Sequence, residues 1–371
     1  MDRRKFISGA ATGAIGIGAA STLAAPAIAQ SNPKIQWRLT SSFPKSLDTL
    51  YGAAKRFADR VREATDGNFE IEVFAAGEIV PGAQVLDAVQ NGTVELGQTA
   101  MYYYVGKNPA FAFGTAVPFG LNARQTNAWF YEGGGNDLFN KFLAKSGVYG
   151  MPAGDTGAQM GGWYRKEIKT VDDLKGLKLR IAGLAGRVVQ KLGVVPQQIA
   201  AGDIYAALER GTLDAVEFVG PYDDEKLGFV KVAPYYYYPA WWEGGANLHH
   251  LVGLDKWNAL PKKYQSLLQT ASQATNCGML ADYDYKNPAA LKRLVAQGAK
   301  LRPFSQDIMQ ASFKAAQELH REISAENADY KALLESQNAY KNDAFLWEQI
   351  AEYSYDTFMM IKQRNGELMK G

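Results

Sequence analysis

A regular alternation of apolar and polar residues begins at Ile35. Residues 35–40 alternate as a strand does. Between residues 47 and 64 the apolar positions recur at steps of three and four, as on one face of a helix, and Gly67 follows where a C-terminal cap belongs. Residues 69–74 alternate again. A strand, a helix and a second strand in this order predict a parallel strand pair and an α/β fold.

The same succession continues along the chain. The next predicted elements are a helix at 83–91, a strand at 94–97, a mostly helical stretch at 122–143 broken at 133–135, a strand at 177–181, helices at 185–192 and 206–210, and a strand at 215–219. From Asp255 onward the pattern is helical, apart from a return strand at 300–303. Two long amphipathic helices are expected there, at 305–326 and 344–360.

These elements suit two α/β lobes that are joined by several chain crossings and carry a helical C-terminal part. A length of 371 residues is long for one lobe and ordinary for two. We place residues 33–152 and 244–275 in the first lobe, and residues 153–243 and 276–371 in the second. Four glycines between 154 and 162 indicate a hinge, or a loop that passes close to a ligand.

Residues 1–29 have the features of an export signal. Arg3-Arg4 precedes a weakly apolar stretch rich in Gly and Ala, and Ala27-Ile28-Ala29 suits a signal peptidase. The twin arginines resemble a Tat signal, and an ordinary Sec signal is the alternative. No later stretch offers about 18 continuous apolar residues for a membrane span. We therefore expect a soluble protein in the periplasm.

Charge and cysteine content exclude several classes of protein. Without the first five residues, basic and acidic side chains number 37 each. A neutral body lacks the surplus of Lys and Arg that phosphate groups require, so no nucleic-acid partner is expected. The single cysteine, Cys277, cannot form an internal disulfide, and we expect a buried, inert thiol. Three histidines are too few for a His-based zinc site.

Candidate chemistry rests on a few charged residues, since no nucleophile elbow, phosphate loop, zinc-protease motif or Cys-x-x-Cys pair is present. We expect the acidic run Asp223-Asp224-Glu225 to be a solvated cap or turn at the start of a helix, and an acid/base pair is the alternative. Arg180 ends a strand and precedes small residues, and its guanidinium can bind a carboxylate through two parallel hydrogen bonds. Glu217 lies in an apolar strand, where burial requires a cation or a donor. Glu243 follows two tryptophans in an aromatic stretch, which is typical of a core or an interface.

Two segments, 171–180 and 206–217, resemble the solute-binding proteins of TRAP transporters, the DctP-type family. The likeness covers residues 34–365. Within the family the chain is most similar to the alpha-keto acid-binding proteins, whose near relatives bind lactate with calcium. The segments that carry this second likeness are 157–163, 220–228 and 235–239. The resemblance implies a two-lobed periplasmic-binding-protein fold that closes on its ligand by hinge motion, delivery to TRAP membrane subunits, and a homodimer formed by exchange of a C-terminal helix.

In that subgroup a metal ion bridges the protein and its ligand. By resemblance, Gln159, Glu217 and Glu243 supply side-chain oxygens to the metal, and Phe218 supplies a backbone carbonyl. Arg180 holds the ligand carboxylate, and Gln159 and Phe218 also lie beside the ligand.

Three positions modify this expectation. Phe218 replaces the tryptophan that is usual in the pattern, so the size of the pocket and the preferred ligand stay open. Asp155 stands where an amide is expected and adds a charge near the site. Two glutamates and a ligand carboxylate against one arginine leave two negative charges, which favours Ca²⁺. The family likeness instead favours Na⁺, with Tyr103 as an additional donor beside the ligand. We predict Na⁺, with Ca²⁺ as the alternative.

The sequence therefore predicts a binding protein and not an enzyme. Its ligand is expected to be a small 2-oxo monocarboxylate such as pyruvate. One alternative is lactate or another 2-hydroxy acid bound with calcium. The other is a metal-dependent enzyme that acts on a carboxylate.

Overall fold

The predicted strand–helix–strand unit opens the first of two sheets in the computed structural model, which describes residues 33–368. The expected export signal at 1–29 lies outside this range. β1 (Ile35–Ser41) pairs in parallel with β2 (Phe69–Phe74), and Ile35 lies opposite Phe69. α1 (Leu50–Ala64) connects them and buries one apolar face. Gly67 adopts a φ of +72° and donates its N–H to the carbonyl of Arg62, which ends the helix.

The first sheet has the order β2-β1-β3-β10-β4. Its other strands are β3 (Leu96–Thr99), β4 (Val148–Asp155) and β10 (Asn247–Gly253). β3 is parallel to β1, and β10 is antiparallel to both β3 and β4. The strand expected at 94–97 thus begins two residues later than predicted.

The second sheet has the order β11-β9-β5-β8-β6-β7. Its strands are β5 (Trp163–Tyr164), β6 (Lys178–Arg180), β7 (Val195–Gln197), β8 (Ala215–Val216), β9 (Tyr235–Tyr238) and β11 (Lys300–Pro303). β6 is parallel to both β7 and β8, and β5 is antiparallel to β8 and β9. The predicted return strand at 300–303 is confirmed. β8 ends at Val216, three residues before the predicted end.

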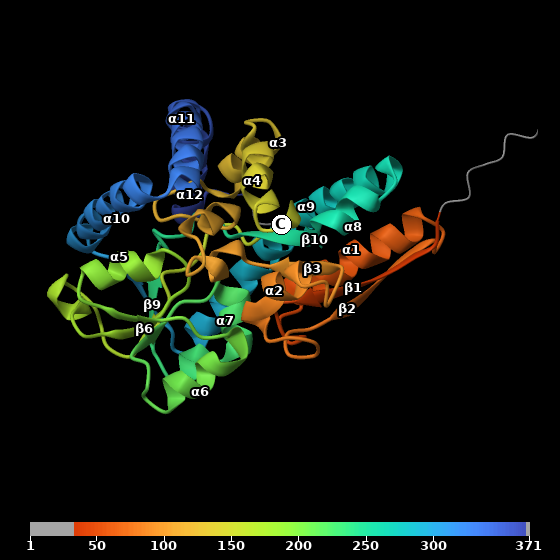
Figure 1. Ribbon diagram of the computed structural model, residues 1–371. Helices are drawn as coiled ribbons and strands as arrows, with labels where there is room; N and C mark the ends of the chain where they lie inside the picture. The colour runs from red at the N-terminus through yellow and green to blue at the C-terminus, as the bar shows by residue number, and fades with distance from the viewer. Residues whose placement is uncertain (1–32, 369–371) are drawn as a thin grey trace, which may run out of the picture. The chain divides into compact units, whose positions relative to one another are not determined.

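Helices cover both sheets and link them (Figure 1). Their bounds are α2 (Val85–Gln90), α3 (Ala123–Tyr131), α4 (Gly135–Ala144), α5 (Ala185–Lys191), α6 (Ile204–Glu209), α7 (Pro221–Leu227), α8 (Leu254–Ala259), α9 (Lys262–Ala296), α10 (Gln306–Glu326), α11 (Ala328–Ile350) and α12 (Glu352–Arg364). α9 packs on α1 and β4 at the first sheet and on α7 at the second. α10 packs on α5, whereas α11 packs on α3 and α4. Within residues 33–368 no helix is long and apolar enough to span a bilayer.

Two expectations about the C-terminal half are wrong. The helix predicted at 344–360 is divided at Ala351, whose φ and ψ of −89° and −79° separate α11 from α12. Its apolar positions also face outward, because α12 has no buried residue. Cys277 is exposed on α9, not buried. Its neighbours Thr275 and Asn276 occupy the inward face of that helix instead.

The chain passes between the sheets in two loops, at 156–162 and at 239–246. Glycines in the first loop are explained by packing. A Cβ on Gly161 would lie 2.4 Å from the Phe304 ring. One on Gly162, whose φ is +86°, would lie 2.4 Å from the Val216 carbonyl oxygen. Two of the predicted lobe boundaries, at 152/153 and 243/244, lie near these loops, and the third, at 275/276, falls inside α9; the division into lobes stays a prediction.

Candidate functional site

Parallel strands β6 and β8 end side by side and place two charged residues at one edge of the second sheet. Arg180 is the last residue of β6, and its register partner Val216 precedes Glu217. The carboxyl ends of strands are where α/β proteins usually bind ligands. The segment 171–180 contains a short turn followed by β6 itself. Asp173 accepts hydrogen bonds from the backbone N–H groups of Lys169 (2.9 Å) and Thr170 (2.8 Å) in the turn that leads to β6.

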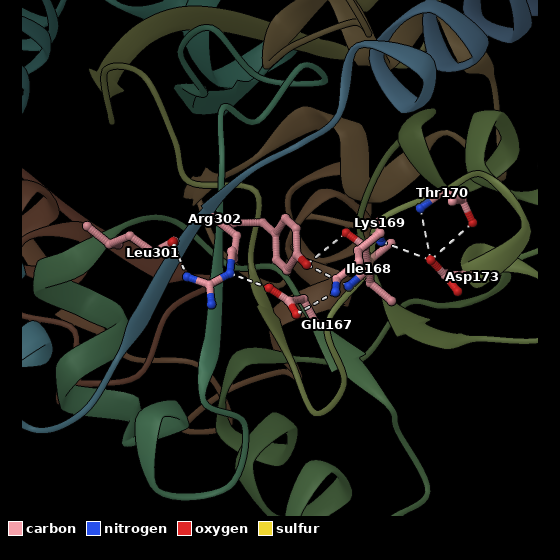
Figure 2. A network of polar contacts seen from close by, with 8 residues as sticks. Glu167, Ile168, Lys169, Thr170, Asp173, Leu301 and Arg302 are labelled. Carbon is pink, nitrogen blue, oxygen red and sulfur yellow. Dashed lines mark hydrogen bonds and ion pairs between the residues drawn. The ribbon is translucent and has the colours of Figure 1, made fainter.

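Figure 2 shows how this turn is tied to the far edge of the sheet. Arg302 of β11 forms an ion pair with Glu167. The Tyr237 hydroxyl on β9 accepts a hydrogen bond from the N–H of Ile168 (2.5 Å) and donates one to its carbonyl (2.8 Å). The residues that precede the turn are therefore tied to β9 and β11.

Arg180 and Glu217 form a fully buried ion pair. Nη1 of Arg180 donates to both the backbone oxygen and Oε1 of Glu217, each at 2.6 Å. Nε donates to the carbonyl of Ile199 at 3.2 Å, and the N–H of Ala182 donates to Oε1 of Glu217 at 3.0 Å. The side chains are 2% and 0% exposed. A buried pair of this kind is tolerated only when hydrogen bonds satisfy it, as they do here for one carboxylate oxygen.

Gln159 and Glu243 approach this pair from the two loops that cross between the sheets. The N–H of Gln159 donates to the carbonyl of Glu243 (3.4 Å), and the N–H of Ala240 donates to the carbonyl of Gln159 (3.2 Å). Nε2 of Gln159 donates to Oγ1 of Thr156 at 3.0 Å, which leaves its Oε1 as the free end of the amide. The structure thus brings the two loops together at the predicted site.

Three buried side-chain oxygens at this place have no hydrogen-bond partner: Oε1 of Gln159, Oε2 of Glu217 and Oε2 of Glu243. Burial raises the pKa of Glu243 well above its usual range, and the charge of Glu217 raises it further. Burial also raises the pKa of Glu217, although Arg180 opposes this shift. Unsatisfied buried oxygens of this type suit a hard cation. Within residues 33–368 no three His, Cys, Asp or Glu side chains gather as a metal-binding cluster, so amide and carbonyl oxygens would have to complete such a site.

A small cavity lies next to these groups. Its lining residues are Phe43, Leu50, Ala100, Tyr102, Tyr103, Thr156, Gln159, Phe218, Val219, Ala246 and Leu248. Three of the predicted ligand-binding residues are among them, namely Tyr103, Gln159 and Phe218. Arg180 does not line the cavity, because the Phe218 ring lies over its guanidinium at 5.5 Å. Glu217 and Glu243 are also outside the lining.

Tyr102 is a site residue that the sequence reasoning missed. Its ring packs on Gly183, where a Cβ would lie only 2.7 Å from the ring. Burial raises its pKa well above the usual value, and the negative charges of Glu243 and Glu217 raise it further. The run of three tyrosines at 102–104 was the only sign in the sequence of a tyrosine-lined site. The pattern of apolar and polar residues does not show which of the three side chains faces a ligand. Tyr104 does not, since its hydroxyl bonds Thr99 (2.8 Å) in the core.

Asp155 is buried at the end of β4, close to the loop that carries Glu243. Its Oδ1 accepts the N–H of Gly157 at 2.9 Å, and its Oδ2 has no partner. Burial raises its pKa to about 7. A Cβ on Gly245 would lie 2.8 Å from Oδ1, which shows how closely the two segments pack. The negative charge expected at Asp155 is therefore present only above a pH of about 7.

The expectation for Asp223-Asp224 is wrong, because both side chains are buried at the start of α7. Oδ2 of Asp224 accepts hydrogen bonds from Nε1 of Trp163 (3.0 Å) and the hydroxyl of Tyr236 (2.7 Å). Asp223 accepts one from the hydroxyl of Tyr283 at 2.5 Å. Burial raises the pKa of Asp223 to about 6 and that of Asp224 to about 7. The aromatic donors come from β5, β9 and α9, which are distant in sequence.

Comparison with known proteins finds extensive similarity. The profile of a family described as bacterial extracellular solute-binding protein, family 7, matches residues 40–327. A monocarboxylate 2-oxoacid-binding periplasmic protein of Nostoc sp. PCC 7120 is 50% identical over 371 residues, covering 98% of this chain and 100% of that protein.

Two solved structures are also similar to this chain. A TRAP transporter solute-binding protein of Bordetella bronchiseptica RB50 has a TM-score of 0.89 and 49% identity, covering 90% of this chain and 100% of its own. It is a mixed-occupancy dimer with copurified calcium and picolinate in an active site. A TRAP periplasmic solute-binding protein of Pseudoalteromonas atlantica T6c, with bound sodium and pyruvate, has a TM-score of 0.84 and 38% identity, covering 87% and 98%.

Proposed function

Because the chain belongs to family 7 of the bacterial extracellular solute-binding proteins, which serve TRAP transporters, we propose that it captures a small 2-oxo monocarboxylate in the periplasm. It then hands this ligand, chemically unchanged, to the membrane subunits of a TRAP transporter. Pyruvate is the representative ligand, and a bound Na⁺ or Ca²⁺ completes the site.

The observation that carries this proposal is the buried pair of Arg180 and Glu217 beside unpartnered oxygens of Gln159, Glu217 and Glu243, because two carboxylates against one guanidinium call for a cation. Protein acceptors occupy Nε and Nη1 of the guanidinium, which leaves Nη2 for a ligand carboxylate. Arginine is suited to this role because its several donors let one guanidinium bind Glu217 and a ligand carboxylate at the same time. Tyr103 lies against the same guanidinium, since the charge of Arg180 opposes the rise in pKa, to about 12, that burial of Tyr103 causes.

The cavity supports a monocarboxylate over a dicarboxylate. None of its described lining residues carries a charge. A second ligand carboxylate would therefore be buried without a cation, which is strongly unfavourable. Phe43, Leu50 and Leu248 instead offer an apolar wall for a short aliphatic group.

The cation would be held by the free oxygens of Gln159, Glu217 and Glu243, together with the Phe218 carbonyl. All four donors are oxygens, which suits Na⁺ or Ca²⁺ and disfavours zinc or copper. Together with Arg180, a bound Ca²⁺ would balance the two glutamates and the ligand carboxylate, whereas Na⁺ would leave one negative charge for hydrogen-bond donors to stabilise. The two solved relatives described above hold sodium with pyruvate and calcium with picolinate.

The proposal is tested by stripping the purified protein with chelator in sodium-free potassium buffer. Pyruvate is then titrated calorimetrically without addition, with Na⁺ and with Ca²⁺. We expect binding only when one of these cations is present, and we expect no binding of succinate under any condition. Equal affinity for pyruvate in all three buffers, or no binding of pyruvate at all, would contradict the proposal.

Two alternatives are separated in the same experiment. Tighter binding of lactate than of pyruvate in the calcium arm would favour a 2-hydroxy acid binder. Consumption of pyruvate, followed by NMR during long incubation with the protein, would show an enzyme. An unchanged pyruvate spectrum is expected for a protein that only binds and releases its ligand.

We also propose that the protein is a homodimer. Support comes from the exposed apolar row on α11 and α12, in which Trp347 is 62% exposed. Soluble monomers seldom expose a contiguous apolar surface of this kind. The other members of this row are Phe345, Leu346, Ile350, Tyr353, Tyr355, Phe358, Met360 and Ile361. The solved relative from Bordetella bronchiseptica is a dimer.

A further inference from the structure

The segment 115–122, between the 3₁₀ helix at Pro109–Gly114 and α3, lies against the loop that carries Glu243. The N–H of Phe119 donates to the carbonyl of Trp241 at 2.9 Å, and the two rings stack at 5.2 Å with an interplanar angle of 14°. A Cβ on Gly244 would lie 3.1 Å from the carbonyl oxygen of Leu121. The segment thus supports the loop on both sides of Glu243.

Phe119 has an unusual backbone conformation. Its φ is +54°, in the left-handed region that a bulky L-residue rarely adopts. Such a conformation persists only when the surrounding contacts determine it. Besides the two contacts with Trp241, the ring meets Phe313 of α10 edge to face at 5.1 Å. The backbone carbonyl of Phe119 is held by a third element, α11.

Helices α10 and α11 each bind one carbonyl of this segment. Nε2 of His320, on α10, donates to the carbonyl of Pro118 at 3.1 Å, and Nζ of Lys341, on α11, donates to that of Phe119 at 3.2 Å. Within residues 33–368 no carboxylate pairs with Lys341. Burial lowers the pKa of Lys341. Partial burial of the unpaired Lys341 ammonium group is unfavourable for the stability of the fold. We therefore assign to this group the role of fixing the backbone carbonyl of Phe119.

We propose that Lys341 is a positioning residue for Glu243, acting through Phe119 and Trp241. The ammonium group fixes the Phe119 carbonyl, the Phe119 N–H fixes the Trp241 carbonyl, and Trp241 lies two residues before Glu243. The role of Glu243 itself rests on the proposed function above. Lys341 does not touch the ligand or the cation, and it is 222 residues away in sequence from the carbonyl that it binds.

The test compares the substitutions K341M and K331M in the full-length mature protein. Methionine preserves the length of the side chain and removes its charge and donors. Lys331 lies on the same helix, is exposed and pairs only with Glu335 in the next turn, so it is the matched control. We expect K341M to weaken Ca²⁺ binding, measured calorimetrically at fixed pyruvate, by about fivefold to tenfold. K331M should stay within about twofold of the wild type, and K341R, which keeps a donor, should restore most of the affinity.

Hydrogen exchange of the amides at 241–247 is measured in parallel, because it requires neither ligand nor cation. We expect faster exchange in K341M than in K331M, with similar exchange in the core strand β1. Wild-type cation affinity in K341M would overturn the proposal, whether or not exchange changes. If the wild type itself fails to bind pyruvate or cation, the proposed function falls, and unchanged exchange at 241–247 would then reject the positioning role separately.

Discussion

At the scale of single residues, the site is organised by one buried guanidinium. Arg180 binds the backbone and side chain of Glu217 together, and this arrangement requires a planar group with several donors. Its contact with the protein leaves it charged and fixed in orientation before any ligand arrives. A ligand carboxylate would therefore meet a donor that loses little further freedom on binding.

This arrangement predicts the effect of Arg180→Lys. A lysine keeps a positive charge beside Glu217 but lacks the separate nitrogen with which the guanidinium could bind a ligand carboxylate while it holds Glu217. We expect pyruvate affinity, measured by calorimetry in saturating Ca²⁺, to fall by a factor of about 30 or more. The control is Arg302→Lys, since Arg302 pairs with Glu167 far from the cavity and should leave affinity unchanged. Wild-type affinity in R180K would exclude a direct contact between Arg180 and the ligand.

At the scale of elements, α7 links the ligand-binding edge to the rest of the second sheet. Its buried Asp224 accepts hydrogen bonds from β5 and β9, and more weakly from the N–H of Val219 at 3.5 Å, just beyond Phe218. The helix also reaches the first half of the protein, because the hydroxyl of Tyr222 donates to Asp48 at 2.9 Å. A short helix of seven residues is thus held by tertiary contacts rather than by its own propensity.

The pKa of Asp224 predicts a pH-dependent effect of Asp224→Asn. Burial raises this pKa to about 7 in the folded protein, so the folded state binds the proton more tightly than the unfolded state does. The wild type therefore loses stability as pH rises from 5 to 8, by about 3 kcal/mol from this group. An asparagine does not ionise, so we expect D224N to be more stable than the wild type at pH 8.

Urea unfolding at pH 5 and pH 8 measures this difference. At pH 5 the free energy of unfolding of D224N should equal that of the wild type or be lower by about 1 kcal/mol. The reason is that an amide replaces the carboxyl group that accepts hydrogen bonds from Trp163 and Tyr236. Asp172→Asn is the control, because that carboxylate is exposed and pairs with Lys175 at the surface. The same stability difference at both pH values would show that Asp224 does not change its protonation between pH 5 and pH 8, which contradicts the prediction.

At the scale of the whole molecule, the two sheets and the helical C-terminal part have the two-lobed fold of TRAP solute-binding proteins, as predicted. The outer face of α12 is the part that packing within one chain does not explain. It has no buried residue, although it carries several aromatic and aliphatic side chains. Burial of these side chains against a second copy would stabilise the assembly by the hydrophobic effect.

The dimer is tested with the double substitution Trp347→Glu and Ile350→Glu. Two charges in an apolar interface should shift the mass measured by light scattering at micromolar concentration from a dimer to a monomer. Tyr285→Glu is the matched control, since Tyr285 is an exposed aromatic residue on α9 and should leave the mass unchanged. A monomer mass for the wild type itself would reject the proposal.

The sequence by itself determined the local order of elements and the candidates for binding. Periodicity located β1, α1 and β2 because one face of each is buried and the other is solvated. The resemblance identified the family, and Arg180 lies at the end of β6 as expected, whereas Glu217, expected within a strand, directly follows the end of β8. Local rules suffice for these features because each depends on residues that are close in sequence.

Only the tertiary structure decided which side chains meet. The burial of Asp223 and Asp224 depends on aromatic donors from other elements, so an acidic turn in the sequence looked solvated. Tyr102 and Tyr104 separated into a site residue and a core residue only when Gly183 and Thr99 came near them. Lys341 and Phe119 meet across 222 positions. Contacts of this range are absent from any local pattern, because they form only when the whole chain closes its loops and packs.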